Sequence, residues 1–169
     1  AVVIGSAGGS ITSTTGVLSG SSYTFNNTSA ASVSAILAGS ANLEQAGAST
    51  TALSGNNTYT GTTTVSAGTL NVTGTLSDST AVTVASGATY IVGANDTVAS
   101  IAGAGNITLT GNLTAGTNTD TTFSGIMSST GSFTKVGSGT LTLSGPNTYT
   151  GTTTVSAGTL LISHNTGLG

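Results

Sequence analysis

The sequence predicts an all-β fold, a β-solenoid in which short strands stack coil upon coil. Three observations predict it: an 18-residue block occurs twice, apolar residues alternate with Thr, Ser or Asn, and glycines recur at intervals of 19 residues. Repetition at a long period is typical of stacked arrays, because each unit leaves an apolar face that its neighbour covers. The alternation and the spacing then decide which kind of array this is.

The repeated block is nearly identical in its two copies. Leu53–Leu70 reads LSGNNTYTGTTTVSAGTL, Leu143–Leu160 reads LSGPNTYTGTTTVSAGTL, and the single difference is Asn56 against Pro146. The copies lie 90 residues apart. The block contains glycines, alternating Thr and Leu, and no charged residue, so it predicts a building element rather than a chemical site.

The expected strands follow a period of two. Val82–Val84, Asn106–Leu109 and Thr140–Leu143 each alternate apolar and polar residues, as strands with one buried face do. They are separated by pairs that end in glycine, which supplies the positive φ of tight corners: Ala67-Gly68, Ser86-Gly87, Ala104-Gly105 and Ser138-Gly139. Helical periodicity is nearly absent.

The spacing of the glycines favours a solenoid over a sandwich. Gly68 to Gly87 and Gly139 to Gly158 are each 19 residues apart, a plausible length for one coil, so the 90-residue offset predicts about four or five coils. A sandwich would instead show hairpin turns without a long-period copy.

The offset extends beyond the block and defines the domain organisation. Apolar and glycine positions correspond at Val33 and Phe123, Ile36 and Ile126, Leu43 and Phe133, and Gly47 and Gly137. The chain is therefore predicted to be a single solenoid over residues 1–169, made of about two copies of a 90-residue unit, approximately 1–79 and 80–169.

Composition excludes several classes of protein. Of the 169 residues 36% are hydrophobic and only 3% are charged, against about a quarter in typical domains, so disorder is rejected. One Lys and four acidic residues give a formal charge of −3, which argues against nucleic acid and against a polybasic membrane contact. There is no cysteine, and no segment predicts a signal peptide or a membrane-spanning segment.

The segment 133–151, FTKVGSGTLTLSGPNTYTG, with its continuation 152–160, resembles the autotransporter-associated β-strand repeat, also called the passenger-associated transport repeat. Residues 122–126, TFSGI, look like the element that commonly precedes it. The first copy matches from Leu53 onward and departs earlier, with Gln45 at the position of Lys135. The close match covers about a quarter to a third of the chain.

This resemblance implies a right-handed parallel β-helix that is extracellular, either secreted from or exposed on a bacterial cell. In that family the repeat is associated with passage of the chain through the outer membrane and with folding outside it. The translocating barrel of the family is not in this sequence.

We predict no catalytic, cofactor-binding or metal-binding residues, and hence no cofactor. The ionisable candidates are expected to be solvated turn positions on separate coils, because catalysis requires groups that converge: Glu44, Asp78, Asp96, Asp120, Lys135 and His164. The glycine-rich calcium nonapeptide is absent, and isolated Asp residues supply too few oxygens for calcium.

Three polar features have both a structural and a functional interpretation. Thr62 with Thr64, and Thr152 with Thr154, could form an ice-binding array, but Thr is also a good strand former and these strands lie several coils apart. Tyr59 and Tyr149, with a nearby Asn, fit a structural corner better than a sugar-stacking surface. Seven Asn-x-Ser/Thr sequons are expected by chance in a chain this rich in Asn and Thr.

Function is expected to lie in shape. Neither end of the chain looks like a polar cap, so we expect either a segment of a longer passenger or self-association through the solenoid ends. The favoured hypothesis is a structural rod or filament subunit that stacks end to end. The alternative is a passenger segment acting as an adhesin, with host or surface glycans or proteins as partners, or as a repeat that promotes folding and secretion. An adhesin should expose an aromatic or polar patch, for instance near Tyr23–Phe25 or Tyr90.

Overall fold

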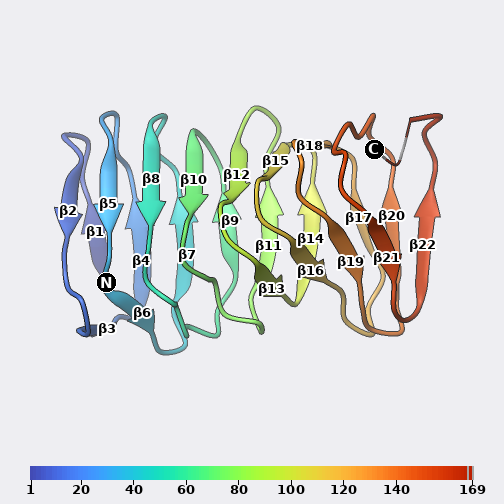
Figure 1. The fold of residues 1–169 in the computed structure, drawn as a ribbon. Helices are drawn as coiled ribbons and strands as arrows, with labels where there is room; N and C mark the ends of the chain where they lie inside the picture. Colours follow the sequence, from blue (N-terminus) through green and yellow to red (C-terminus); the bar gives the residue numbers. More distant parts are fainter. Residues whose placement is uncertain (167, 169) are drawn as a thin grey trace.

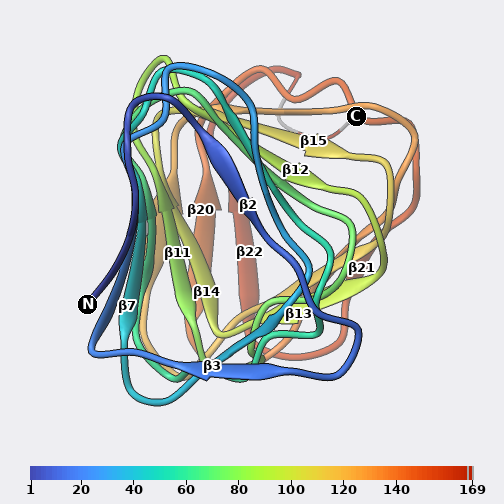
Figure 2. The same ribbon diagram turned by 90° about the vertical axis from the view of Figure 1, so that its left-hand side faces the viewer.

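The computed structural model describes residues 1–166 and 168, and within this range the chain consists of 22 short strands, turns and loops without a helix. All strand pairs are parallel, and successive coils stack into a solenoid of about eight turns (Figure 1). The predicted β-solenoid is therefore confirmed. Seen from the N-terminal end, the chain ascends on the side of β7 and descends on the side of β2 as it recedes, which is a right-handed coil (Figure 2).

The solenoid has three faces. The nine-strand face runs through the whole described length and is formed by β1 (Val2–Ile4), β4 (Ser22–Phe25), β7 (Asn42–Gln45), β9 (Thr63–Val65), β11 (Ala81–Val84), β14 (Ser100–Gly103), β17 (Thr121–Phe123), β20 (Thr140–Leu143) and β22 (Thr159–Ile162). The seven-strand face is formed by β2 (Gly9–Ile11), β5 (Ala31–Val33), β8 (Thr50–Leu53), β10 (Thr69–Val72), β12 (Thr89–Val92), β15 (Asn106–Leu109) and β18 (Ile126–Ser128).

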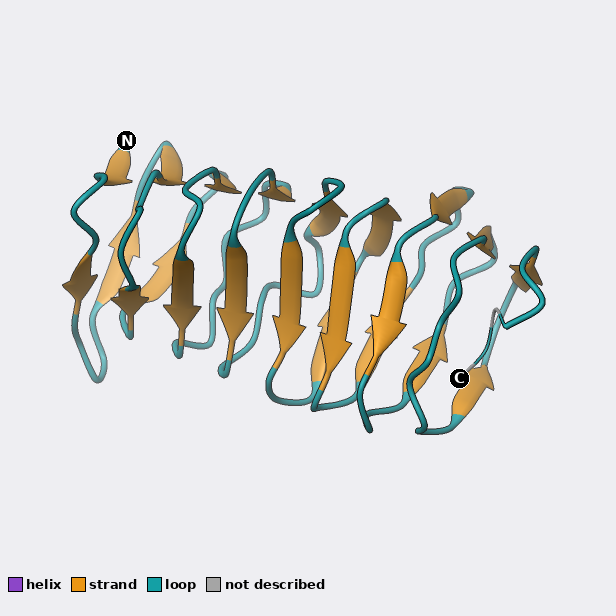
Figure 3. Cartoon of the chain, turned by 90° about the horizontal axis from the view of Figure 1, so that it is seen from above, coloured by secondary structure: helices purple, strands orange, loops and turns teal. Residues whose placement is uncertain are grey.

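The third face is interrupted in its middle. It comprises a pair, β3 (Val17–Ser19) and β6 (Ile36–Ala38), and a four-stranded sheet, β13 (Asp96–Val98), β16 (Leu113–Ala115), β19 (Phe133–Lys135) and β21 (Thr153–Val155). Figure 3 shows the strands of successive coils side by side, joined by loops. Between β6 and β13 the chain passes this face in irregular segments around Asn57 and Leu76, where side chains replace part of the backbone ladder.

Each coil advances by a nearly constant number of residues. On the nine-strand face, paired residues are 21 apart from Val2 to Tyr23, 20 apart from Leu43 to Thr63, and 19 apart from Thr63 to Val82. The strands alternate as predicted: in β20 Leu141 and Leu143 point into the core while the two threonines are half-buried. This period-2 pattern leaves one apolar residue in two to fill the interior.

The interior contains every aromatic side chain of the protein. The four tyrosines and three phenylalanines are at most 1% exposed, and they pack with Val, Leu, Ile and Ala: Tyr23, Phe25, Tyr59, Tyr90, Phe123, Phe133 and Tyr149. The exposed aromatic rings that an adhesin would show near Tyr23–Phe25 and Tyr90 are therefore not found, because these rings lie on inward positions of β4 and β12. Burial of each ring removes a large apolar area from water and stabilises the stack.

Glycine is required at the corners for two different reasons. Gly68 and Gly87 adopt positive φ angles of 58° and 84°, as expected for tight corners. A column of Gly105, Gly125 and Gly145 is needed for close packing instead, since a Cβ on Gly125 would lie 1.6 Å from the carbonyl oxygen of Gly105. Neighbouring coils thus approach each other there as closely as backbone allows.

The two copies of the repeated block occupy different faces. The side chain of Asn57, in the first copy, accepts a hydrogen bond from the backbone N–H of Leu37 in β6, on the third face. The side chain of Asn147, in the second copy, accepts the same hydrogen bond from Met127 in β18, on the seven-strand face. Every strand of the block shows the same shift; β9 belongs to the nine-strand face and its counterpart β21 to the third. Ninety residues therefore span four turns and two further faces, so identical sequence fits two different walls of the solenoid.

Candidate functional site

The six ionisable candidates fall into two groups. Glu44, Asp78, Asp120 and His164 are exposed, as expected for solvated positions. Asp96 and Lys135 are instead 5% and 1% exposed. For these two the expectation of a solvated turn is wrong, because both occupy inward positions of third-face strands, where the period-2 pattern carries any side chain into the core.

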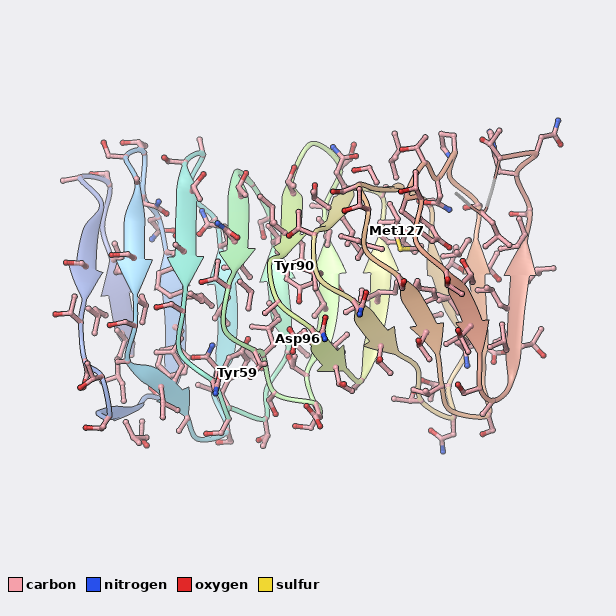
Figure 4. All side chains as sticks on the ribbon, in the orientation of Figure 1. Tyr59, Tyr90, Asp96 and Met127 are labelled. Atoms are coloured by element: carbon pink, nitrogen blue, oxygen red, sulfur yellow. The ribbon has the colours of Figure 1, made fainter. Side chains whose placement is uncertain are left out.

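Asp96 forms a buried polar cluster with its neighbours (Figure 4). Its carboxylate accepts a hydrogen bond from the backbone N–H of Leu76, which lies 3.2 Å from Oδ1 and 3.1 Å from Oδ2. It also accepts hydrogen bonds from the hydroxyl of Tyr90 at 3.1 Å and from the N–H of Thr97 at 3.0 Å. Loss of solvation raises the pKa of Asp96, although these three donors oppose the shift. Burial also raises the pKa of Tyr90, and the adjacent carboxylate raises it further.

Lys135 is held by backbone oxygens. Its Nζ donates to the carbonyl of Val136 at 2.5 Å, of Gly137 at 2.8 Å and of Ala157 at 3.3 Å. The equivalent residue of the first copy, Gln45, is equally buried and donates to the carbonyls of Gly47 and Ser49 and to Asn27, while its own Oε1 has no partner. Both side chains therefore bind the backbone carbonyls of the corner that follows them, and both are almost fully buried.

The Tyr and Asn residues of the repeat are structural. The hydroxyl of Tyr59 hydrogen-bonds Thr63 at 2.6 Å, and that of Tyr149 hydrogen-bonds Thr153 at 2.5 Å. Asn57 accepts from Leu37 at 3.0 Å and donates to the carbonyls of Gly55 and Thr75. Sugar stacking on these tyrosines is ruled out in this fold, because both rings are fully buried.

The threonine rows do not form one array. Thr62 and Thr64 lie at the nine-strand face, whereas Thr152 and Thr154 lie at the third face. The longest unbroken column is instead on the third face, where four threonines pair in register: Thr97, Thr114, Thr134 and Thr154. The adjoining side chains of Asn112 and Ser132 are used to cap the backbone of the following coil, so this column stands alone.

The two end coils leave inward-facing apolar residues partly exposed. These are Val2, Ile11 and Leu18 at one end, and Val155, Leu160 and Ile162 at the other. Val65, the counterpart of Val155 in the first copy, is completely buried, because β9 has a neighbouring strand on both sides. The difference in exposure between Val155 and Val65 shows how much surface one covering coil buries at such a residue.

The burial of Asp96 and Lys135 was not predicted from the sequence. The signal was available in the alternation, since Lys135 shares its phase with Phe133, and Asp96 shares its phase with Val98. Within the described residues, no three His, Cys, Asp or Glu side chains are grouped so that they could hold a metal ion. Nor does the described part of the chain include a helix with the length and apolarity to cross a membrane.

Comparison with known proteins identifies the repeat. Residues 43–72 and 133–162 each match the model of the passenger-associated transport repeat, which confirms the resemblance read from the sequence. The first match begins at Leu43 and so includes the part in which Gln45 replaces the lysine. No curated protein matches the chain, and neither does any solved structure.

Proposed function

We propose that the chain is a rod-forming structural module of a secreted or surface-exposed bacterial protein. The observation that carries this proposal is the nine-strand face, a parallel sheet whose register continues from β1 to β22 without a break. Such a stack transmits length and stiffness through its backbone ladders and its filled interior. The extracellular location is supported by the two passenger-associated transport repeats.

We further propose that the rod extends by end-to-end stacking with a second copy. Among the described residues, the outer edges of β1 and β22 have no neighbouring strand, and the inward apolar residues beside them, such as Val2 and Ile162, are half-buried. Another coil placed against either edge would bury them as the internal coils bury Val65. Few charges oppose this contact, because Glu44, Asp78 and Asp120 are the only exposed acidic side chains.

Electron microscopy combined with light scattering tests this stacking. Wild-type chain at high concentration should form rods longer than one solenoid, and the length should increase with concentration. Ile162→Lys places a charge on an inward position of the open edge and should abolish elongation, whereas Thr142→Lys, on a half-exposed outward position, should not. Monodisperse wild-type particles without end-to-end contacts would overturn the proposed filament but not the proposed role as a rod-forming module.

A second candidate function is promotion of folding and secretion. It is favoured by the description of the matched family, which associates this repeat with passenger transport. If the second copy has this role, Tyr149→Ala, which removes a buried ring from it, should reduce surface display more than Tyr23→Ala, which removes a buried ring outside both matches. Equal losses of display would indicate that the rings contribute only to stability.

The proposal includes no catalytic activity, cofactor or metal. Glu44, Asp78 and Asp120 belong to different coils, and the strands that carry Asp96 and Lys135 are separated by β16 within the third-face sheet. Incubation with polysaccharides and analysis of the products would test this point, and any cleavage that Asp96→Asn removes would contradict it.

A further inference from the structure

Asp96 occupies a structural position that elsewhere in this solenoid is occupied by an amide. Asn57 accepts from the N–H of Leu37 at 3.0 Å, and Asn147 accepts from the N–H of Met127 at 2.7 Å. Asp96 accepts in the same way from the N–H of Leu76, a residue 20 positions earlier in the chain. Three coil-to-coil contacts thus share one design, and only the one at Asp96 can change its charge.

The ionised form of Asp96 has no compensating cation. The titratable groups that face it are Tyr90 from β12, Tyr59 from the preceding irregular segment and Asp78 from the Leu76 segment, and all three are neutral or negative. The one lysine, Lys135, lies two strands further along the sheet and is engaged by three carbonyl oxygens. A carboxylate buried without a cation is costly, whereas a buried neutral acid with hydrogen-bond partners is not.

The neutral acid fits the same surroundings. A proton on Oδ2 would be donated to the Tyr90 hydroxyl, reversing the direction of that 3.1 Å hydrogen bond. Oδ1 would continue to accept from the N–H groups of Leu76 and Thr97. Protonation therefore removes the buried charge without removing the contacts between the two coils.

We propose that Asp96 is a pH-sensitive latch in the middle of the solenoid, closed when its carboxyl is protonated and loosened when it ionises. The latch joins the Leu76 segment to β13, at the point where the interrupted third face becomes a continuous sheet. An acidic environment tightens this junction, and neutral or alkaline pH weakens it. The rod would therefore have at this point an internal joint whose stiffness follows the pH of its surroundings.

Amide hydrogen exchange on the full chain tests the latch with internal controls. After correction for the intrinsic exchange rate, protection of the Leu76 amide should fall by about tenfold between pH 4 and pH 8, because ionisation of Asp96 weakens the contact that this amide makes. The amides of Leu37 and Met127, which donate to Asn57 and Asn147, should keep the same protection over this range.

Two variants complete the test. Asp96→Asn should remove the pH dependence at Leu76 while retaining the strand content measured by circular dichroism. Asp78→Asn removes the nearby exposed acid and should leave most of that dependence in place. The proposal is overturned if Leu76 follows Leu37 and Met127 at every pH, or if the dependence persists in Asp96→Asn. Should that variant fail to fold, the comparison of the three amides in the wild-type chain still decides the question.

Discussion

Gly125 offers the sharpest test of how closely the coils pack. It lies between β17 and β18, and a Cβ placed there would be 1.6 Å from the carbonyl oxygen of Gly105 in the preceding coil and 2.9 Å from the ring of Phe123. Ordinary contacts begin at 3.4 Å, so Gly125→Ala requires the two coils to separate locally by about 1.8 Å. The obstructing atom belongs to the backbone and cannot rotate away.

The magnitude follows from what that separation breaks. Ser124 donates to the carbonyl of Gly103 at 2.8 Å, and a shift of this size would break that hydrogen bond, at a cost of about 1 kcal/mol. Overpacking in a close-packed interior adds about 1–3 kcal/mol. We therefore expect Gly125→Ala to lower the free energy of unfolding by about 2–4 kcal/mol.

Denaturant unfolding followed by circular dichroism measures the effect against two matched glycines. Gly5→Ala meets no atom within 4 Å and should have almost no effect. Gly87→Ala also meets no atom, but its φ of 84° is unfavourable for alanine and should cost about 1–2 kcal/mol. Unfolding of Gly125→Ala at the same denaturant concentration as Gly5→Ala would contradict this expectation, because the coils would then be free to separate.

Three further expectations concern the buried polar groups. Asn57→Ala removes three hydrogen bonds, two of which join neighbouring coils, and should lower the free energy of unfolding by about 2–3 kcal/mol in denaturant unfolding. In the same measurement Asn56→Pro reproduces the second copy and should change that free energy by less than about 0.5 kcal/mol. Lys135→Gln imitates the first copy and should shift the melting temperature less than Lys135→Met, which leaves three carbonyls unpaired; equal shifts would contradict the proposed role of the corner. Burial raises the pKa of Tyr59 and of Tyr90, so the folded state retains their protons and loses stability as the pH rises above the usual tyrosine range; in ultraviolet titration both should ionise only together with unfolding.

Much of the fold follows from local pattern, because alternation decides which residues point inward. That pattern places Leu141, Leu143 and Phe133 correctly, and it also places Lys135 inward, although a lysine is normally expected in solvent. The burial of Lys135 depends on carbonyl oxygens from its own turn and from Ala157, 22 residues later, which no local pattern reveals. The alternation of a strand can therefore show correctly that a charged side chain points inward, while its residue type wrongly suggests that it lies in solvent.

The assignment of the repeated block to faces could not be predicted for a different reason. The block determines which side chains are buried, but nothing in it distinguishes one wall of the solenoid from another, as Tyr59 and Tyr149 show by making the same hydrogen bond on two faces. The face is set by accumulated coil length, which varies between 19 and 21 residues along the nine-strand face. Because 90 residues are not a whole number of coils of this length, the second copy of the block begins on a different wall.

This change of wall means that the repeat sets the position of its residues around the axis of the solenoid. Each 90-residue period advances the chain by four turns and two faces, so equivalent residues of successive periods would appear one wall away from each other around the axis. Three periods would bring them back to the starting wall, and a surface feature that occurs once per period would follow a helical path around the rod. Duplication or loss of one period would consequently change the direction in which every later surface residue points, while leaving the interior of the solenoid undisturbed.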